Sequence, residues 1–257
     1  MKRGASDADL RVAVVGDFQI GKSSLVNCFV AESCAETGEG YFPTTDAVAE
    51  YPFDPGVRLV DTPGFNDARP ELTKKSEKAI ESADVVLFIK TEKTLGERDG
   101  GILRLSGGKP LLVLFNCTDK TLGRQGWALE HPINTEICGT IEAQLAEYGF
   151  APSVIRIDGR LVTPINVLWA QFGLGQSISD EQKTDVAQFA RQKLGLDLPE
   201  MELRAELLGK SGFPPVWDFL KNLPLELLKH AVSNPQRELD RIVDRFVAEL
   251  KKRWPAA

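Results

Sequence analysis

The chain has 257 residues and a mass of 28.3 kDa, enough for one large domain or for an ordinary domain with a smaller appendage. Its composition, 42% hydrophobic and 26% charged, is typical of globular proteins and excludes a largely disordered chain. The formal net charge of -6 provides no general attraction to nucleic acid, so no specific nucleic-acid partner is predicted.

The cysteines and the first residues bear on the cellular compartment. Cys28, Cys34, Cys117 and Cys138 form no CxxC pair, and with 2 histidines the chain has little to offer a zinc ion. The first residues, MKRGASDADLR, contain no apolar run of the kind that a secretory signal needs, and Lys2 excludes the N-myristoylation pattern. We therefore expect a cytoplasmic protein with reduced thiols.

Short apolar runs alternate with segments of helical length through the first two thirds of the chain. The runs are continuously hydrophobic, which suits strands covered on both faces, and they lie at 11–15, 57–61, 84–90, 110–116 and 153–158. The intervening helices are expected at 23–31, 70–82, 94–106 and 133–148. The pattern predicts an α/β fold with helices on both faces of a mostly parallel sheet.

Two further segments complete this part. Residues 47–53 alternate in polarity and join 57–61 through the turn DPG, which predicts one antiparallel edge strand and a six-stranded sheet. The apolar segment LVTPINVLWAQFGLG, 161–175, is interrupted by Pro164, Asn166 and Gln171 and is too short and polar to span a membrane. It is predicted to be a buried helix.

Beyond about residue 175 the strand signals stop and successive helices are predicted, so we divide the chain into regions 1–175 and 176–257. The final helix has an apolar stripe at three- and four-residue spacing, formed by Leu239, Ile242, Val243, Phe246, Leu250 and Trp254. This stripe either packs on the rest of the protein or binds a partner.

The segment GDFQIGKSS, residues 16–24, matches the pattern G-x-x-x-x-G-K-[ST] between a predicted strand and a predicted helix. Glycines at 16 and 21 permit the backbone to wrap a phosphate with its N–H groups pointing inward, and the helix start adds its dipole. The candidate ligand-binding residues are Gln19, Ile20, Gly21, Lys22, Ser23 and Ser24. Lys22 is expected to reach the β- and γ-phosphates, Ser23 to bind Mg²⁺, and Ser24 to lie near the α-phosphate.

The segment DTPGF, 61–65, follows the predicted strand 57–61, where a second carboxylate for Mg²⁺ is expected. Asp61 would hold a metal-bound water, and the N–H group of Gly64 would bond the γ-phosphate until hydrolysis removes it. This segment is therefore a candidate sensor of the nucleotide state.

The segment NCTD, 116–119, ends the predicted strand 110–116. In an N-x-x-D arrangement the Asp119 carboxylate can accept hydrogen bonds from N1–H and the exocyclic amine of guanine, which adenine does not offer. Adenine would leave that carboxylate desolvated and unpaired, at a cost of about 1–3 kcal/mol. Asn116 and Asp119 therefore predict guanine specificity.

Together these motifs resemble those of P-loop GTPases of the translation-factor-related class, in the Era, TrmE, septin and dynamin-like neighbourhood. The resemblance covers about residues 10–172 and implies a Ras-like fold and a GTP/GDP switch that uses Mg²⁺. In such proteins a threonine of the first switch binds Mg²⁺ and the γ-phosphate. That role falls on Thr45 or, failing that, Thr44, in the segment YFPTTD.

The chain departs from the family pattern at several positions. Phe65 replaces the glutamine that orients water in Ras-like enzymes, so we expect slow hydrolysis unless a partner, a potassium ion or a second copy supplies that group. Gln19 stands where potassium-stimulated relatives have Asn, and Cys117 stands where the base motif usually has Lys. The last motif, Ser-Ala-Lys, is missing after 153–158. Gly159 and Arg160 are the candidates to contact the base instead.

Three functions compete at this point. The first is a GTPase switch read by the helical tail or by a protein partner, with self-association as one route to activation. The second is a module that binds GTP stably with negligible hydrolysis, and the third is an ATPase or nucleotide kinase, which NCTD disfavours. The short basic end formed by Lys251, Lys252, Arg253 and Trp254 could also contact a membrane or a ribosome, although a solvated helix end is the favoured explanation.

Overall fold

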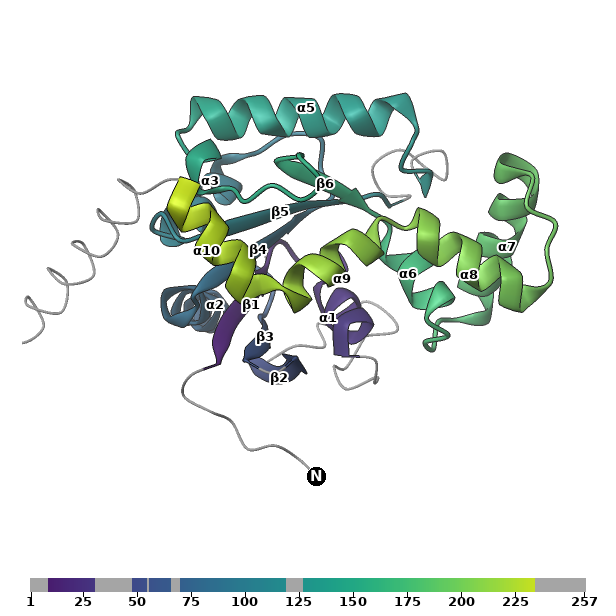
Figure 1. Ribbon diagram of the computed structural model, residues 1–257, viewed down its shortest axis with the longest axis horizontal. Coiled ribbons are helices and arrows are strands. Elements are labelled where there is room, and N and C mark those ends of the chain that lie inside the picture. Colours follow the sequence, from purple (N-terminus) through teal and green to yellow (C-terminus); the bar gives the residue numbers. More distant parts are fainter. Residues whose placement is uncertain (1–8, 31–47, 55, 66–69, 119–126, 234–257) are drawn as a thin grey trace, which may run out of the picture.

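A computed structural model describes residues 9–30, 48–54, 56–65, 70–118 and 127–233 (Figure 1). The strands are β1 (Leu10–Val15), β2 (Ala49–Asp54), β3 (Val57–Asp61), β4 (Val85–Lys90), β5 (Leu111–Asn116) and β6 (Val162–Ile165). The helices are α1 (Lys22–Val30), α2 (Pro70–Ser82), α3 (Glu97–Leu105), α5 (Pro132–Glu147), α6 (Val167–Gly173), α7 (Asp180–Leu194), α8 (Glu200–Lys210), α9 (Phe213–Lys221) and α10 (Leu223–Ser233).

The six strands form one sheet in the order β2-β3-β1-β4-β5-β6. Strand β2 runs antiparallel to β3 at one edge, and all other neighbouring strands are parallel. The predicted fold class, a Ras-like α/β fold with one antiparallel edge strand, is confirmed. Because the five parallel strands point the same way, their carboxyl ends meet along one edge, where the loops that follow them can form a site.

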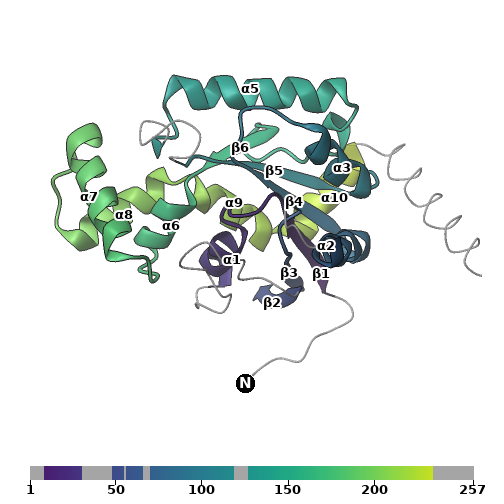
Figure 2. The same cartoon turned by 180° about the vertical axis from the view of Figure 1, so that it is seen from behind.

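Side chains alternate along each strand and build an apolar core on each face of the sheet. Val12 and Val14 pack with α1, α9 and the start of α10 on one face, which is nearer the viewer in Figure 1. Ala13 and Val15 pack with α2, α3 and α5 on the other face, seen in Figure 2. Within the described residues no helix is both long and apolar enough to cross a lipid bilayer.

The strand predicted at 153–158 is wrong. Residues Ala151–Ser153 form a short 3-10 helix, and Val154 makes a single bridge to Leu111. Asp158 and Gly159 then adopt positive φ angles of 49° and 79°, which turns the chain before a strand can extend. The sixth strand is instead β6, and it lies at a sheet edge, where its Pro164 is tolerated.

The single helix predicted over 161–175 is consequently also wrong. Its first part is β6, and only its second part is helical, in α6. Asn166 separates the two elements, because its side chain accepts a hydrogen bond from the Trp169 N–H group at 3.0 Å and caps the start of α6.

The helices after residue 175 have two different neighbours. Helices α7 and α8 pack with α6 around their own apolar cluster, which includes Trp169, Phe189 and Leu207, at one end of the molecule (Figure 1). Helix α9 returns to the sheet, where Phe213 lies with its ring centroid 5.0 Å from that of Phe29 on α1. The boundary at residue 175 stays a prediction. The stripe predicted at 239–254 lies outside the described residues.

The contact between α6 and α8 provides a test of this packing. A Cβ atom at Gly173 would lie 2.6 Å from the Leu208 Cβ and 2.8 Å from the Arg204 carbonyl oxygen. We expect Gly173→Ala to lower the free energy of unfolding by about 1–3 kcal/mol in urea titrations. The control is Gly139→Ala in α5, where a Cβ meets nothing within 4 Å and should stabilise the helix. Equal effects at both positions would contradict the close packing.

Candidate functional site

The loop between β1 and α1 has the conformation that a phosphate-binding loop needs. Gly16 and Gly21 have φ angles of 149° and 93°, which side chains with a Cβ rarely adopt. Gln19 is exposed with a φ of 55°, whereas Ile20 is buried and anchors the loop in the core. Helix α1 starts at Lys22, so its first N–H groups and the positive end of its dipole face the loop.

Lys22 and Asp61 are buried charges that lie close together. Lys22 is 7% exposed, and its Nζ donates a hydrogen bond of 2.6 Å to the Asp17 carbonyl oxygen. Burial lowers the pKa of Lys22 to about 8, although nearby Asp61 and Asp17 oppose that shift. A buried ammonium with a lowered pKa gains from an anion that restores its charge, and phosphate is such an anion.

Asp61, at the end of β3, accepts a hydrogen bond of 2.7 Å from the Ser23 hydroxyl to its Oδ2 atom. It is 1% exposed, and burial raises its pKa against the opposing effects of Ser23, Lys22 and the Thr62 N–H group. Its other oxygen, Oδ1, is buried without a hydrogen-bond partner. A hydroxyl beside a carboxylate with one unused oxygen is a donor set that suits Mg²⁺. Ser23 and Asp61 therefore fit the predicted metal.

The segment that starts with Asp61 passes directly over the loop. A Cβ atom at Gly64 would lie 2.7 Å from the Phe18 Cα, so only glycine allows this approach. The N–H group of Phe65 donates a hydrogen bond of 3.4 Å to the Gly16 carbonyl oxygen. The Phe65 side chain is half-buried and packs against the core on the α2 and α3 face. It therefore neither offers a polar group to water nor points freely into solvent.

Asn116 ties the loop to the far side of the site. Its Nδ2 donates to the Ile20 carbonyl oxygen at 2.9 Å, and its Oδ1 accepts from the Val167 N–H group at 3.2 Å. The residue is 3% exposed, and a Cβ at Gly21 would come within 3.0 Å of its Nδ2. Asn116 therefore joins three segments: the loop, the end of β5 and the start of α6.

The structure brings most of the described candidates together. Lys22, Ser23, Asp61 and Asn116 meet at the carboxyl edge of the sheet with the loop residues 19–21, Gly64 passes over that loop, and Ser24 lies in the first turn of α1. Thr44, Thr45 and Asp119 lie outside the described residues.

Two residues are not brought to this edge. Gly159 and Arg160 lie in the turn before β6, at its amino end, whereas the other candidates follow the carboxyl ends of parallel strands. They were misplaced because the sixth strand was expected before them and lies after them. Cys117 is buried in the core on the α2 and α3 face, where burial raises the pKa of its thiol. It therefore takes no part in the site either.

Sequence reasoning missed two groups at this edge. The loop after β6, at Asn166 and Val167, lies where a base-contacting segment was sought, and the β-branched run 162–165 before an N-cap asparagine could have located it. Lys90, the last residue of β4, is 3% exposed and forms ion pairs with Asp99 and Glu92. A lysine at the end of an apolar strand was the available signal.

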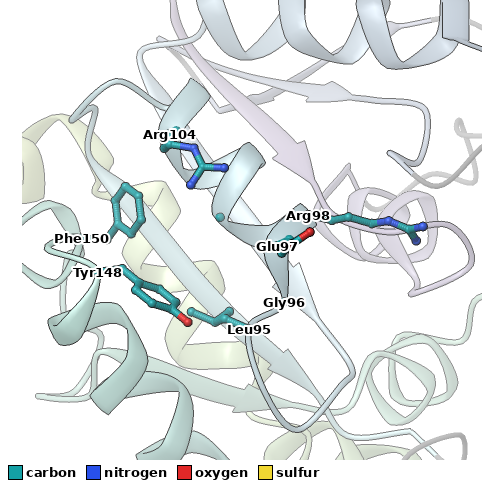
Figure 3. A pocket seen from close by; sticks show the side chains of 8 residues that line it. Leu95, Gly96, Glu97, Arg98, Arg104, Tyr148 and Phe150 are labelled. Carbon is teal, nitrogen blue, oxygen red and sulfur yellow. The ribbon is translucent and has the colours of Figure 1, made fainter.

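A hollow lies between α3 and the turn after α5 (Figure 3). It has a volume of about 920 Å³, with Leu95 and Arg104 on one side and Tyr148 and Phe150 on the other. None of the residues with phosphate- or metal-binding chemistry described above lines it. This hollow is therefore separate from the candidate site, which is the edge around Lys22 and Asp61.

The fold and this site resemble those of P-loop GTPase domains. Residues 11–117 match the family model described as "50S ribosome-binding GTPase". The chain is 32% identical over 117 residues to a tRNA modification GTPase MnmE from Ligilactobacillus salivarius, and 36% identical over 117 residues to that of Streptococcus agalactiae. These matches cover 43% of this chain but 25% and 26% of the relatives. The chain thus spans about a quarter of their length.

Solved structures are similar at lower identity. The Aquifex aeolicus Era structure bound to GDP and aluminium fluoride aligns with a TM-score of 0.45 and 20% identity, over 68% of this chain and 55% of that one. LeoA, a bacterial dynamin GTPase, aligns with a TM-score of 0.39 and 14% identity, over 91% and 42%. The predicted resemblance to P-loop GTPases of the Era, TrmE and dynamin-like neighbourhood is confirmed by the family model and the curated relatives.

Proposed function

We propose that this chain binds GTP and GDP with Mg²⁺ and hydrolyses GTP slowly, as a nucleotide-dependent switch. The observation that carries the proposal is the pair of buried, incompletely compensated charges, Lys22 and Asp61, beside the loop. An anion compensates the first and a cation the second. A magnesium-bound triphosphate supplies both at once.

The chain's own residues divide the work. The N–H groups of the loop from Gln19 to Ser24 hold the phosphates, and Lys22 moves its hydrogen bond from the Asp17 carbonyl oxygen to them. Ser23, Asp61 and, by resemblance, Thr45 would hold Mg²⁺, which neutralises charge on the β- and γ-phosphates when bound. Gly64 supplies an N–H group to the γ-phosphate.

Guanine selectivity is assigned to Asp119. Asn116 holds the phosphate loop at Ile20 and the start of α6 at Val167 in place. We place the remaining base contacts in the loop after β6, around Asn166 and Val167, rather than at Gly159 and Arg160. This assignment follows from the hydrogen bond that Val167 makes with Asn116, because it draws that loop to the same edge as Lys22.

Slow hydrolysis is proposed because the half-buried Phe65 side chain packs against the core and offers no polar atom to a water molecule. A partner protein, a second copy or a potassium ion beside Gln19 would supply the missing group. The same observation favours the second candidate function, a stable GTP-binding module with negligible turnover.

Calorimetry with GTP, GDP and ATP in the presence of Mg²⁺ tests binding and its selectivity. We expect heat from both guanine nucleotides and little from ATP, and we expect Lys22→Met to lose binding while Lys193→Met, an exposed lysine at the end of α7, keeps it. Absence of heat with GTP and GDP would refute the proposal. Single-turnover phosphate release, with and without potassium, separates a slow GTPase from the stable binder.

A further inference from the structure

A buried ionic cluster borders the phosphate loop. Lys90 Nζ donates hydrogen bonds to Asp99 Oδ2 at 2.7 Å and to Glu92 Oε2 at 2.6 Å. Asp99 also accepts from the Gly96 N–H group at 2.7 Å, which fixes it at the start of α3. The Lys90 ammonium group is therefore bonded to one carboxylate in the loop after β4, that of Glu92, and to one in α3, that of Asp99.

Asp17, the second residue of the phosphate loop, belongs to the same cluster. Strands β1 and β4 are parallel neighbours, with Val15 opposite Phe88, so the residues that follow them lie side by side. A narrow space without room for a water molecule is lined by Asp17, Ile20, Ile89, Lys90, Thr91, Glu92 and Asp99. The Oδ1 atom of Asp17 is buried there without a hydrogen-bond partner.

The cluster has more negative than positive groups. The charged groups that face Asp17 are Lys22 from α1, Lys90 from the end of β4, Glu92 from the next loop and Asp99 from α3. Burial raises the pKa of Asp17 most, followed by Asp99, whereas Lys90 lowers it, Glu92 raises it and Lys22 lowers it. A phosphate bound in the loop adds negative charge and draws the Lys22 ammonium toward itself.

We propose that Asp17 tunes the affinity of the phosphate loop for its anionic ligand by taking up a proton from the buffer when a guanine nucleotide binds. The inference rests on the proposed function. The bound phosphates favour the neutral carboxyl, so the pKa of Asp17 is higher in the complex than in the free protein. The affinity for the nucleotide is then greatest at pH values below the pKa that Asp17 has in the free protein. It falls as the pH rises from that pKa to the pKa that Asp17 has in the complex.

The test is calorimetry of GDP with Mg²⁺ between about pH 5.5 and pH 8.5, in buffers of different ionisation enthalpy, for the full chain and Asp17→Asn. Since the nucleotide phosphates and Lys22, whose pKa is about 8, also titrate in this range, the variant is the reference. We expect the native chain to take up more protons than the variant. Above the titration range, we expect the variant to bind about tenfold more tightly for each pKa unit by which the phosphate raises Asp17.

A second variant, Glu92→Gln, removes a carboxylate whose side chain is 68% exposed and should move the pH-dependent range downward. Equal proton uptake and equal pH slopes for the native chain and Asp17→Asn would overturn the inference while leaving the proposed function standing. No binding of GDP by any of the three proteins at any pH would instead overturn the proposed function itself.

Discussion

Replacing Phe213 with alanine is expected to lower the free energy of unfolding by about 3–5 kcal/mol, because the ring fills the core between α9 and the sheet. Its centroid lies 5.0 Å from that of Phe29, and alanine would leave a cavity against α1. A loss of this size is a large share of the about 5–15 kcal/mol that holds a typical domain together. Urea unfolding monitored by circular dichroism measures it.

The control is Met201→Ala in α8, a substitution of an apolar side chain that is 78% exposed. It should change the free energy of unfolding by no more than about 0.5 kcal/mol. If both variants were equally stable, α9 would not be part of the core that covers β1 and β3.

A fragment that ends at residue 175 lacks α9, and we expect it to expose apolar surface and to aggregate.

Replacing Asn116 with alanine is expected to weaken both the fold and nucleotide binding. The Ile20 carbonyl group and the Val167 N–H group would each lose a buried partner, at about 1–3 kcal/mol for each group. Because the same side chain positions the loop at Ile20, we expect GTP and GDP affinity to fall by about tenfold or more. Unfolding titrations and calorimetry measure the two effects separately.

Asn222→Ala is a matched control, because the exposed Asn222 side chain also donates one hydrogen bond, of 2.8 Å, to the Asp218 carbonyl oxygen. Its loss should cost about 1 kcal/mol or less and leave nucleotide affinity unchanged. Normal stability and normal affinity in the Asn116 variant would show that this residue does not hold the two segments together.

Much of the fold could be predicted from the sequence because continuous apolar runs mark buried parallel strands. Each of the strands β1, β3, β4 and β5 coincides with such a run. The sixth strand could not be predicted, because the run SVIRID at 153–158 has the composition of a strand but does not form one. A turn at Asp158 and Gly159 prevents these residues from extending as a strand, and that turn depends on tertiary context. The error then moved the base-side candidates to the wrong end of β6.

The candidate site was more predictable where a motif fixes spacing. Lys22, Ser23 and Asp61 meet as expected because a loop and a neighbouring strand end must lie together in a parallel sheet. The role of Cys117 could not be read from its position in NCTD, because the alternation of side chains at the end of β5 directs it into the core. The ionic cluster around Lys90 could not be predicted from the sequence, because the fold brings its partners Glu92 and Asp99 together.

The late position of α9 in the chain has a consequence for biosynthesis. The strands β1, β3, β4 and β5 are complete by Asn116, but Phe213, Val216 and Leu220 are translated about a hundred residues later. At about 5–20 residues per second, the nascent polypeptide spends roughly 5–20 s with that side of the sheet partly uncovered. During this interval the emerging chain presents an apolar surface of the kind that chaperones bind.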